Sequence, residues 1–143
     1  MTQPIEAAIY AISQVVAGVS GIVQAPNYPN ETQSYGPFAL TYFQNGTAEG
    51  GPIGTRRNLI NISIDVLIFR DNLPAALATL TPLIDLVTFA LMAEVSGSGQ
   101  RFTNTISTFD KISIQLLPMV EYAGKNTIGY RFTMMNVKLL VSQ

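Results

Sequence analysis

One long alternating stretch, from Asn58 to Arg70, constrains the fold of this 143-residue chain more than any other feature. β-Branched apolar residues occupy every second position, and they are Ile60, Ile62, Ile64, Val66 and Ile68. Asn61, Ser63 and Asp65 alternate with them, which predicts a half-buried β-strand with these polar side chains exposed. Leu67 and Phe69 make the second face apolar as well, and this indicates contact with a second surface, such as another subunit.

The pattern around this strand predicts a single α+β domain over residues 1–143, with a mixed, mainly antiparallel sheet. An N-terminal helix, capped by Thr2 and apolar at Ile5, Ile9, Ile12, Val16 and Val19, should cover the sheet. Residues 22–25 and 38–43 read as strands. Residues 45–55 contain four glycines and a proline, so we expect a mobile loop there.

A central helical segment should also pack on the sheet. Its residues 73–95 carry only two charges, but Asp85 at the centre and the interrupting Pro82 argue against a membrane span. We expect two soluble helices, over 74–80 and 82–94, and the second should bury Leu83, Leu86, Val87, Ala90 and Leu91.

The C-terminal third should return to β-structure over about 101–109, 112–122 and 128–141, with a hairpin turn at 123–126. Pro118 cannot donate to a strand ladder, so its strand should lie at an edge or contain a bulge.

The composition excludes several kinds of chemistry. The chain has no cysteine and no histidine, so a Ser-His-Asp triad, a cysteine nucleophile and a zinc site of the usual ligands are ruled out. A formal charge of −1 argues against wholesale nucleic-acid binding. We expect no enzyme activity, no catalytic residues, no cofactor and no metal. No secretory signal is apparent at Met1–Glu6, which predicts that the chain stays in the cytoplasm where it is made.

Low charge instead points to a protein partner. Charged residues make up 12% of the chain against about 25% in ordinary soluble domains, and apolar residues make up 48%. The alternative is an uncharged surface rich in Ser, Thr and Asn. The candidate interface residues are two arginines before the long strand, apolar and aromatic side chains, and glycines of the expected loop: Arg56, Arg57, Leu67, Phe69, Tyr42, Phe43, Gly50 and Gly51. Solvated charge is the alternative reading for the arginines, and core packing for the aromatic residues.

The order of these elements resembles the tail terminator, or tail completion, proteins of long-tailed bacteriophages. The resemblance rests on the strand R-R-N-L-I-N-I-S-I-D-V-L-I-F-R, the helical segment D-N-L-P-A-A-L-A-T-L-T-P-L-I and the C-terminal hairpin, and it covers nearly the whole chain. It implies a subunit of a homohexameric ring in the virion tail or neck. Such a ring caps the tail tube, stops tube polymerisation and offers a surface for head–tail joining.

The partners implied by this resemblance are further copies of the chain, the tail tube protein and a head–tail connector or neck protein. DNA passes through the channel only as cargo, no membrane is involved, and assembly takes place in the host cytoplasm. A tail tube or connector subunit is the alternative within this class, and a small-molecule-binding α+β domain is the alternative outside it.

Overall fold

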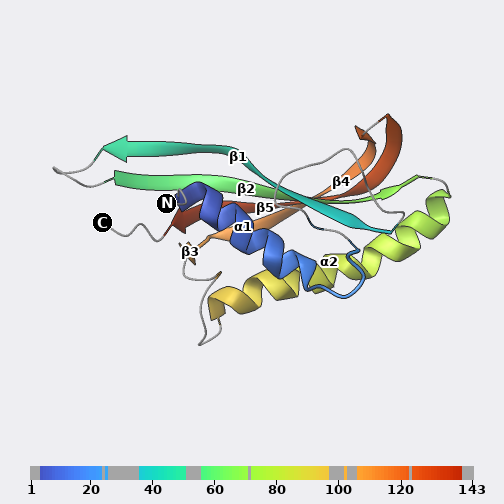
Figure 1. Ribbon diagram of the computed structural model, residues 1–143, viewed down its shortest axis with the longest axis horizontal. Helices are drawn as coiled ribbons and strands as arrows, with labels where there is room; N and C mark the ends of the chain where they lie inside the picture. Colours follow the sequence, from blue (N-terminus) through green and yellow to red (C-terminus); the bar gives the residue numbers. More distant parts are fainter. Residues whose placement is uncertain are drawn as a thin grey trace.

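A computed structural model describes residues 4–23, 25, 36–50, 56–70, 72–96, 102, 106–122 and 124–139. It confirms the α+β class, with helices and strands in the order α1 (Pro4–Ala17), β1 (Phe38–Gly50), β2 (Arg56–Phe69), α2 (Leu73–Ser96), β3 (Ile106–Thr108), β4 (Lys111–Tyr122) and β5 (Lys125–Leu139). Both helices pack against one face of the sheet, as Figure 1 shows. We call this the helix face and the opposite one the outer sheet face.

The sheet is antiparallel at each pairing of the described strands. Its order is β1-β2-β5, and β5 then pairs on its other side with β4 and, beyond it, with β3. The pairs Ile106↔Leu139 and Lys111↔Met135 place β3 and β4 one after the other along the same edge of β5. The β4–β5 hairpin curls at its far end (Figure 1). β1 therefore forms one edge of the sheet, and β3 with β4 forms the other.

The core lies between the helix face and the two helices. Ile62 and Ile64 of β2 are fully buried there, as the alternation predicted, and Phe132 and Met134 lie beside them on β5. Burial of each such side chain contributes about 1.5–3 kcal/mol. The apolar spacing of the N-terminal helix is also confirmed, because α1 buries Ala8, Ala11, Ile12 and Val16 in this core.

Two strand predictions need correction. The described residues Ile22, Val23 and Ala25 form no strand. The chain turns at Gly21 (φ +102°), and the Val23 amide donates a hydrogen bond to the carbonyl of Pro37 (2.7 Å) outside any strand ladder. Residues 45–50, predicted as loop, instead continue β1, with Gly50 opposite Arg56. A bulge after Phe43 permits this, and backbone pairing needs no apolar side chains. The remaining loop residues, 51–55, lie outside the described residues.

The central segment is one helix, not two. Asn72 caps it, accepting a hydrogen bond from the Ala75 amide through Oδ1 (3.2 Å). Pro82 lies inside the helix, and Thr81, which falls between the two predicted helices, donates through its hydroxyl to the Leu77 carbonyl (2.7 Å). Proline removes only one amide donor from the helix. The helix continues through it because the residues before and after Pro82 are packed in the core.

The buried side of α2 consists of Ala76, Leu80, Leu83, Val87 and Leu91. Leu86, predicted to be buried, is instead 45% exposed. By length and composition alone, Leu73–Glu94 would suffice to cross a membrane. In this fold, however, one side of the helix forms part of the core.

The C-terminal hairpin agrees closely with its prediction. β4 lies at the sheet edge, and its register shifts between Leu117 and Val120, around Pro118. Tyr122 pairs with Lys125, so Lys125 and Asn126, predicted as turn residues, belong to β5, and Gly124 before them adopts φ +79°.

Candidate interaction surfaces

Leu67 and Phe69, expected at a subunit interface, pack within the subunit. Leu67 is buried on the outer sheet face in a small cluster with Phe38, Leu40 and Leu117. The Phe69 ring packs against this cluster, with its centroid 5.8 Å from that of Phe38. The ammonium of Lys125 lies 5.1 Å from the Phe69 centroid, a cation–π distance. The second apolar surface inferred from β2 is therefore supplied by the chain's own β1 and β4.

Asp65 was predicted to be exposed, and this is wrong. It is 6% exposed, and Arg131, directly opposite on β5, contacts it through two hydrogen bonds, Nε to Oδ1 (2.8 Å) and Nη2 to Oδ2 (3.2 Å). Tyr42 on β1 donates its hydroxyl to Oδ2 (3.0 Å). The carboxylate thus accepts three hydrogen bonds, which offset the cost of burying its charge.

The same contacts set the protonation of this cluster. Burial raises the pKa of the Tyr42 hydroxyl above its ordinary value of 10.0, and the charge and hydrogen bond of Asp65 raise it further. The hydrogen bond to Asp65 also raises the pKa of Arg131. The arginine charge and the neutral phenol are both stabilised, so this cluster forms a fixed structural network at neutral pH.

A second polar group continues this network along the outer sheet face. Ser63 is fully buried and donates its hydroxyl to Oε1 of Gln44, and its oxygen lies 3.2 Å from the hydroxyl of Thr133. Thr133 also donates to Gln44 (3.4 Å). Ser63 and Asp65 of β2 are therefore buried together with polar partners, which the side chains of β1 and β5 supply. One signal was available in the sequence, since polar residues also alternate at Arg131 and Thr133.

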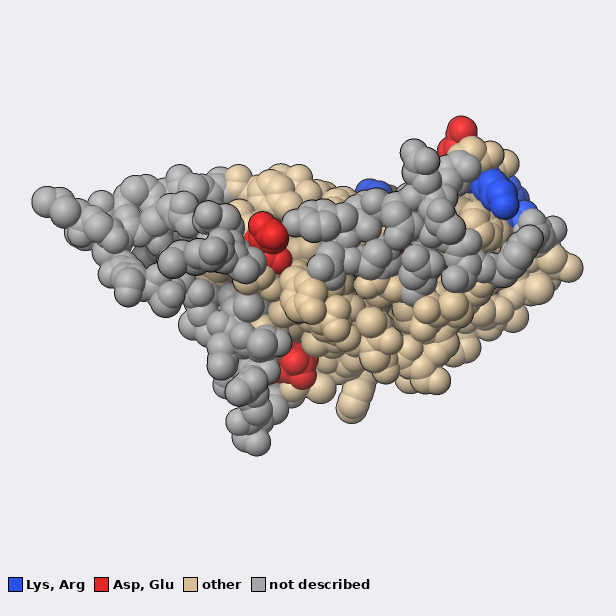
Figure 2. Space-filling model, viewed as in Figure 1, with Lys and Arg blue, Asp and Glu red and all other residues tan. Residues whose placement is uncertain are grey.

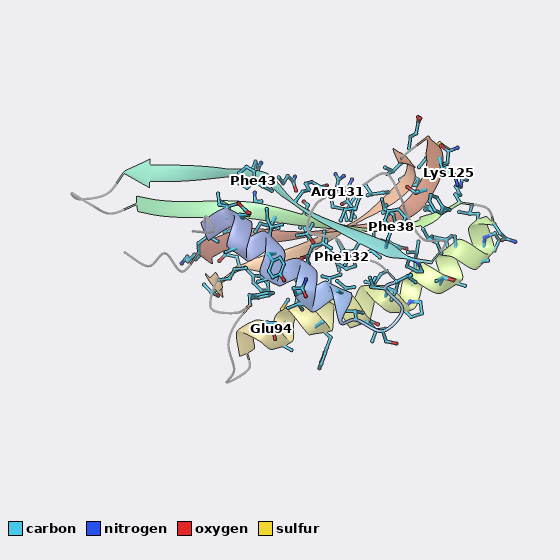
Figure 3. All side chains as sticks on the ribbon, viewed as in Figure 1. Phe38, Phe43, Glu94, Lys125, Arg131 and Phe132 are labelled. Atoms are coloured by element: carbon cyan, nitrogen blue, oxygen red, sulfur yellow. The ribbon has the colours of Figure 1, made fainter. Side chains whose placement is uncertain are left out.

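The other predicted interface residues differ in exposure and in the contacts that they make. Phe43, at the β1 edge and labelled in Figure 3, is 43% exposed and stays available to a partner. Tyr42 is held by Asp65. Arg56 and Arg57 pair through their backbones with Gly50 and Glu49, and their side chains lie outside what the structure describes. Gly51 lies outside the described residues.

An exposed apolar surface on α2 was missed at the sequence level. Leu86, Phe89 and Met92, which we call the α2 stripe, are 45%, 76% and 43% exposed. Figure 2 shows a broad uncharged surface over this helix. The signal was present, because α2 carries apolar residues on two sides, one formed by Leu83, Val87 and Leu91 and the other by the stripe.

A groove runs between the α2 stripe and the C-terminal end of α1. It encloses about 460 Å³ and is lined by residues that include Val15 and Gly18 from α1 and Leu86, Phe89, Ala90 and Glu94 from α2. Glu94 accepts a hydrogen bond from the Phe102 amide (3.3 Å), which fixes one carboxylate oxygen at the end of the groove. The groove thus combines apolar side chains with the carboxylate of Glu94 and the polar side chains of Gln14 and Ser20.

Further exposed apolar side chains lie on the edge strand β4. Ile114, Leu116 and Met119 are 42%, 45% and 57% exposed. Within the described part of the chain, no three His, Cys, Asp or Glu side chains gather in a group able to hold a metal ion. The described surface is thus richer in features for protein contact than in reactive groups.

Comparison with protein-family models and with curated proteins finds no match to this chain, so its functional interpretation depends on its own residues and geometry.

Proposed function

We propose that this chain is a structural subunit of a bacteriophage virion that assembles into a ring, with a hexamer favoured. The ring caps the tail tube, stops its polymerisation and offers a joining surface to the head–tail connector. In this proposal the chain is not an enzyme, acts without a cofactor, and assembles in the host cytoplasm. The observation that carries the proposal is the α2 stripe, which leaves Phe89 76% exposed beside an open groove.

Exposure of this kind costs free energy in an isolated subunit and favours association. Burial of apolar surface contributes about 25 cal/mol per Å² of favourable free energy. Aromatic side chains that are exposed in the free subunit often become the anchor residues of an interface. The element order that resembles tail terminators supports the choice of a virion ring among assembly proteins. A tail tube or connector subunit uses the same kinds of contact and is the alternative within this class.

A small-molecule-binding domain is the second candidate, and the groove favours it, because 460 Å³ lies within the usual range for ligand sites. Such sites place convergent polar groups around an apolar floor. Here the polar lining residues are Gln14, Ser20 and Glu94, and Glu94 already accepts a hydrogen bond from the Phe102 amide. The proposal of a protein partner accounts for the groove together with the adjoining stripe.

Deletion of this chain from its phage tests the proposal. We expect tail tubes of uncontrolled length that do not join heads, because nothing occupies the position where the next tube ring adds. Electron microscopy of the lysate measures both. Wild-type protein supplied in trans should restore normal tails, whereas Ile64→Asp should not, since it places an unpaired charge in the core. Normal-length tails joined to heads in the deletion would contradict the proposal.

A further inference from the structure

The two helices and the sheet differ in the charged residues that they carry. α1 and α2 contain Glu6, Asp85 and Glu94 and no lysine or arginine. Lysine and arginine appear instead on the strands, and Figure 3 labels Lys125 and Arg131 on the sheet and Glu94 on α2. The helix layer is therefore acidic.

The pairing register places the basic residues on the outer sheet face. Lys111 lies opposite Met135 of β5. Met135 is two residues beyond Thr133, and Thr133 contacts Ser63 on the outer sheet face. Lys138 lies opposite Leu59, whose neighbour Ile60 belongs to the helix-face core. Since side chains alternate between faces, Lys111 and Lys138 share the outer sheet face with Arg131. Both lysines are exposed. Asp65 on this face is paired with Arg131, and Asp110, which precedes Lys111, accepts a hydrogen bond from the Asn136 side chain (2.8 Å).

The helix layer presents an apolar centre with acidic residues around it. The α2 stripe supplies the apolar part, Asp85 precedes it in the same helix and is exposed, and Glu94 lies at the end of the groove. A matching surface needs cations at the rim and apolar groups at the centre. Lysine provides both, because its methylene stem covers apolar surface and its ammonium can reach a carboxylate or an aromatic face. Lys125 already makes such a contact with Phe69 within the subunit.

We propose that a second copy of this chain docks on the α2 stripe and groove with the part of its outer sheet face that carries Lys111 and Lys138, so that these lysines of one subunit meet Phe89, Asp85 and Glu94 of the next. This inference rests on the proposed ring for its choice of occupant. A membrane surface fits poorly, because the acidic residues would be repelled by anionic lipids. The two surfaces in contact differ, so the association is head-to-tail, the kind that closes into a ring when the rotation between subunits allows it.

Two variants, each disabling one of the two surfaces, test the contact. Phe89→Asp places a charge at the centre of the stripe. The double variant Lys111→Glu with Lys138→Glu reverses the charge of the basic surface. All three positions are exposed, so both variants should fold. Sedimentation velocity should show self-association of the wild type and weakening by about 30-fold or more in Phe89→Asp. Each variant alone should be monomeric, whereas an equimolar mixture should form a heterodimer, because one intact surface remains on each partner.

Met119→Asp is the matched control, since Met119 is also exposed but lies near the end of β4 opposite to Lys111, and this variant should associate like the wild type. Circular dichroism and melting temperature establish that each variant is folded. A wild type that stays monomeric at the highest attainable concentration would overturn the inference, as would a mixture without heterodimer. Association unaffected by the lysine reversal would indicate a symmetric α2–α2 contact and would overturn it too.

Vesicles containing anionic lipid test the alternative occupant. Binding by the wild type that is lost in Phe89→Asp would identify a membrane as the occupant and would also overturn the inference.

Failure of the head-to-tail contact is distinguishable from failure of the proposed function. A monomeric protein whose deletion yields long, unjoined tails removes only the head-to-tail contact. Heterodimer formation together with normal tails in the deletion removes only the assignment to the tail.

Discussion

At the scale of single residues, Asp65 illustrates where prediction from sequence ended. Alternation placed it correctly on the face opposite Ile64, but the favoured exposure was wrong because its partners come from far along the chain. Arg131 is 66 residues away and Tyr42 is 23 residues away. Alternation reports which side of a strand a residue occupies, while burial depends on what the neighbouring strands place opposite it.

Gly129 shows a residue that the backbone itself constrains. A Cβ built at this position would lie 1.9 Å from the Val66 carbonyl oxygen and 2.8 Å from Leu67 Cδ2, so the central β2–β5 pair would have to separate. We expect Gly129→Ala to lower the free energy of unfolding by about 3 kcal/mol or more. Urea denaturation measures this. Gly18→Ala, whose Cβ would meet its nearest atom at 3.5 Å, should be tolerated, and equal effects of the two would contradict the argument.

Tyr42 should make stability depend on pH in the alkaline range. Its pKa is raised in the folded state, so the stabilisation is fully present below about pH 10 and is lost as pH rises through the folded-state pKa. Tyr42→Phe also loses the hydrogen bond to Asp65, at a cost of about 1 kcal/mol at neutral pH. Denaturant titrations across this range should show the gap between wild type and variant narrowing as the pH rises. Parallel stability curves would refute the assignment.

At the scale of elements, the sequence located most of the helices and strands but not their lengths. The long strand, the N-terminal helix and the C-terminal hairpin follow from strong periodicity and from a turn at Gly124. The extension of β1 to Gly50 could not be predicted, because ladder hydrogen bonds need no particular side chain. The interaction surface was missed for a different reason: apolar periodicity on α2 does not say which of two apolar sides faces the core.

Pro82 offers a test of why α2 is continuous. It is exposed and interrupts the hydrogen-bond ladder of a helix whose other side is anchored in the core. Pro82→Ala restores an amide donor without removing core contacts, so we expect the free energy of unfolding to rise by about 2 kcal/mol. Thermal denaturation provides the measurement. Thr81→Ala, which removes only a side-chain hydrogen bond to Leu77, serves as the control and should change stability little. An unchanged melting temperature in Pro82→Ala would count against this account.

At the scale of the whole molecule, the helices carry Glu6, Asp85 and Glu94 without lysine or arginine, whereas Lys111 and Lys138 lie on the outer sheet face. If Lys111 and Lys138 meet Asp85 and Glu94 of a neighbour, salt should oppose association. The Debye length falls from about 10 Å at 0.1 M to about 3 Å at 1 M salt. We therefore expect the dissociation constant measured by sedimentation to increase with salt, and less so in Asp85→Asn. Association that strengthens with salt in both proteins would indicate a purely apolar contact.

The bulge at Pro118 has a consequence for how subunits meet at high concentration. An edge strand with an uninterrupted row of free amides invites pairing with the same edge of another molecule, and this route leads to fibres. Pro118 brings no amide, and the register shift around it breaks the regular spacing of β4. Exposed Ile114 and Leu116 are thereby prevented from becoming the start of a continuous intermolecular sheet. We therefore expect that restoring an amide at this position, as in Pro118→Val, would favour edge-to-edge association of subunits at high concentration.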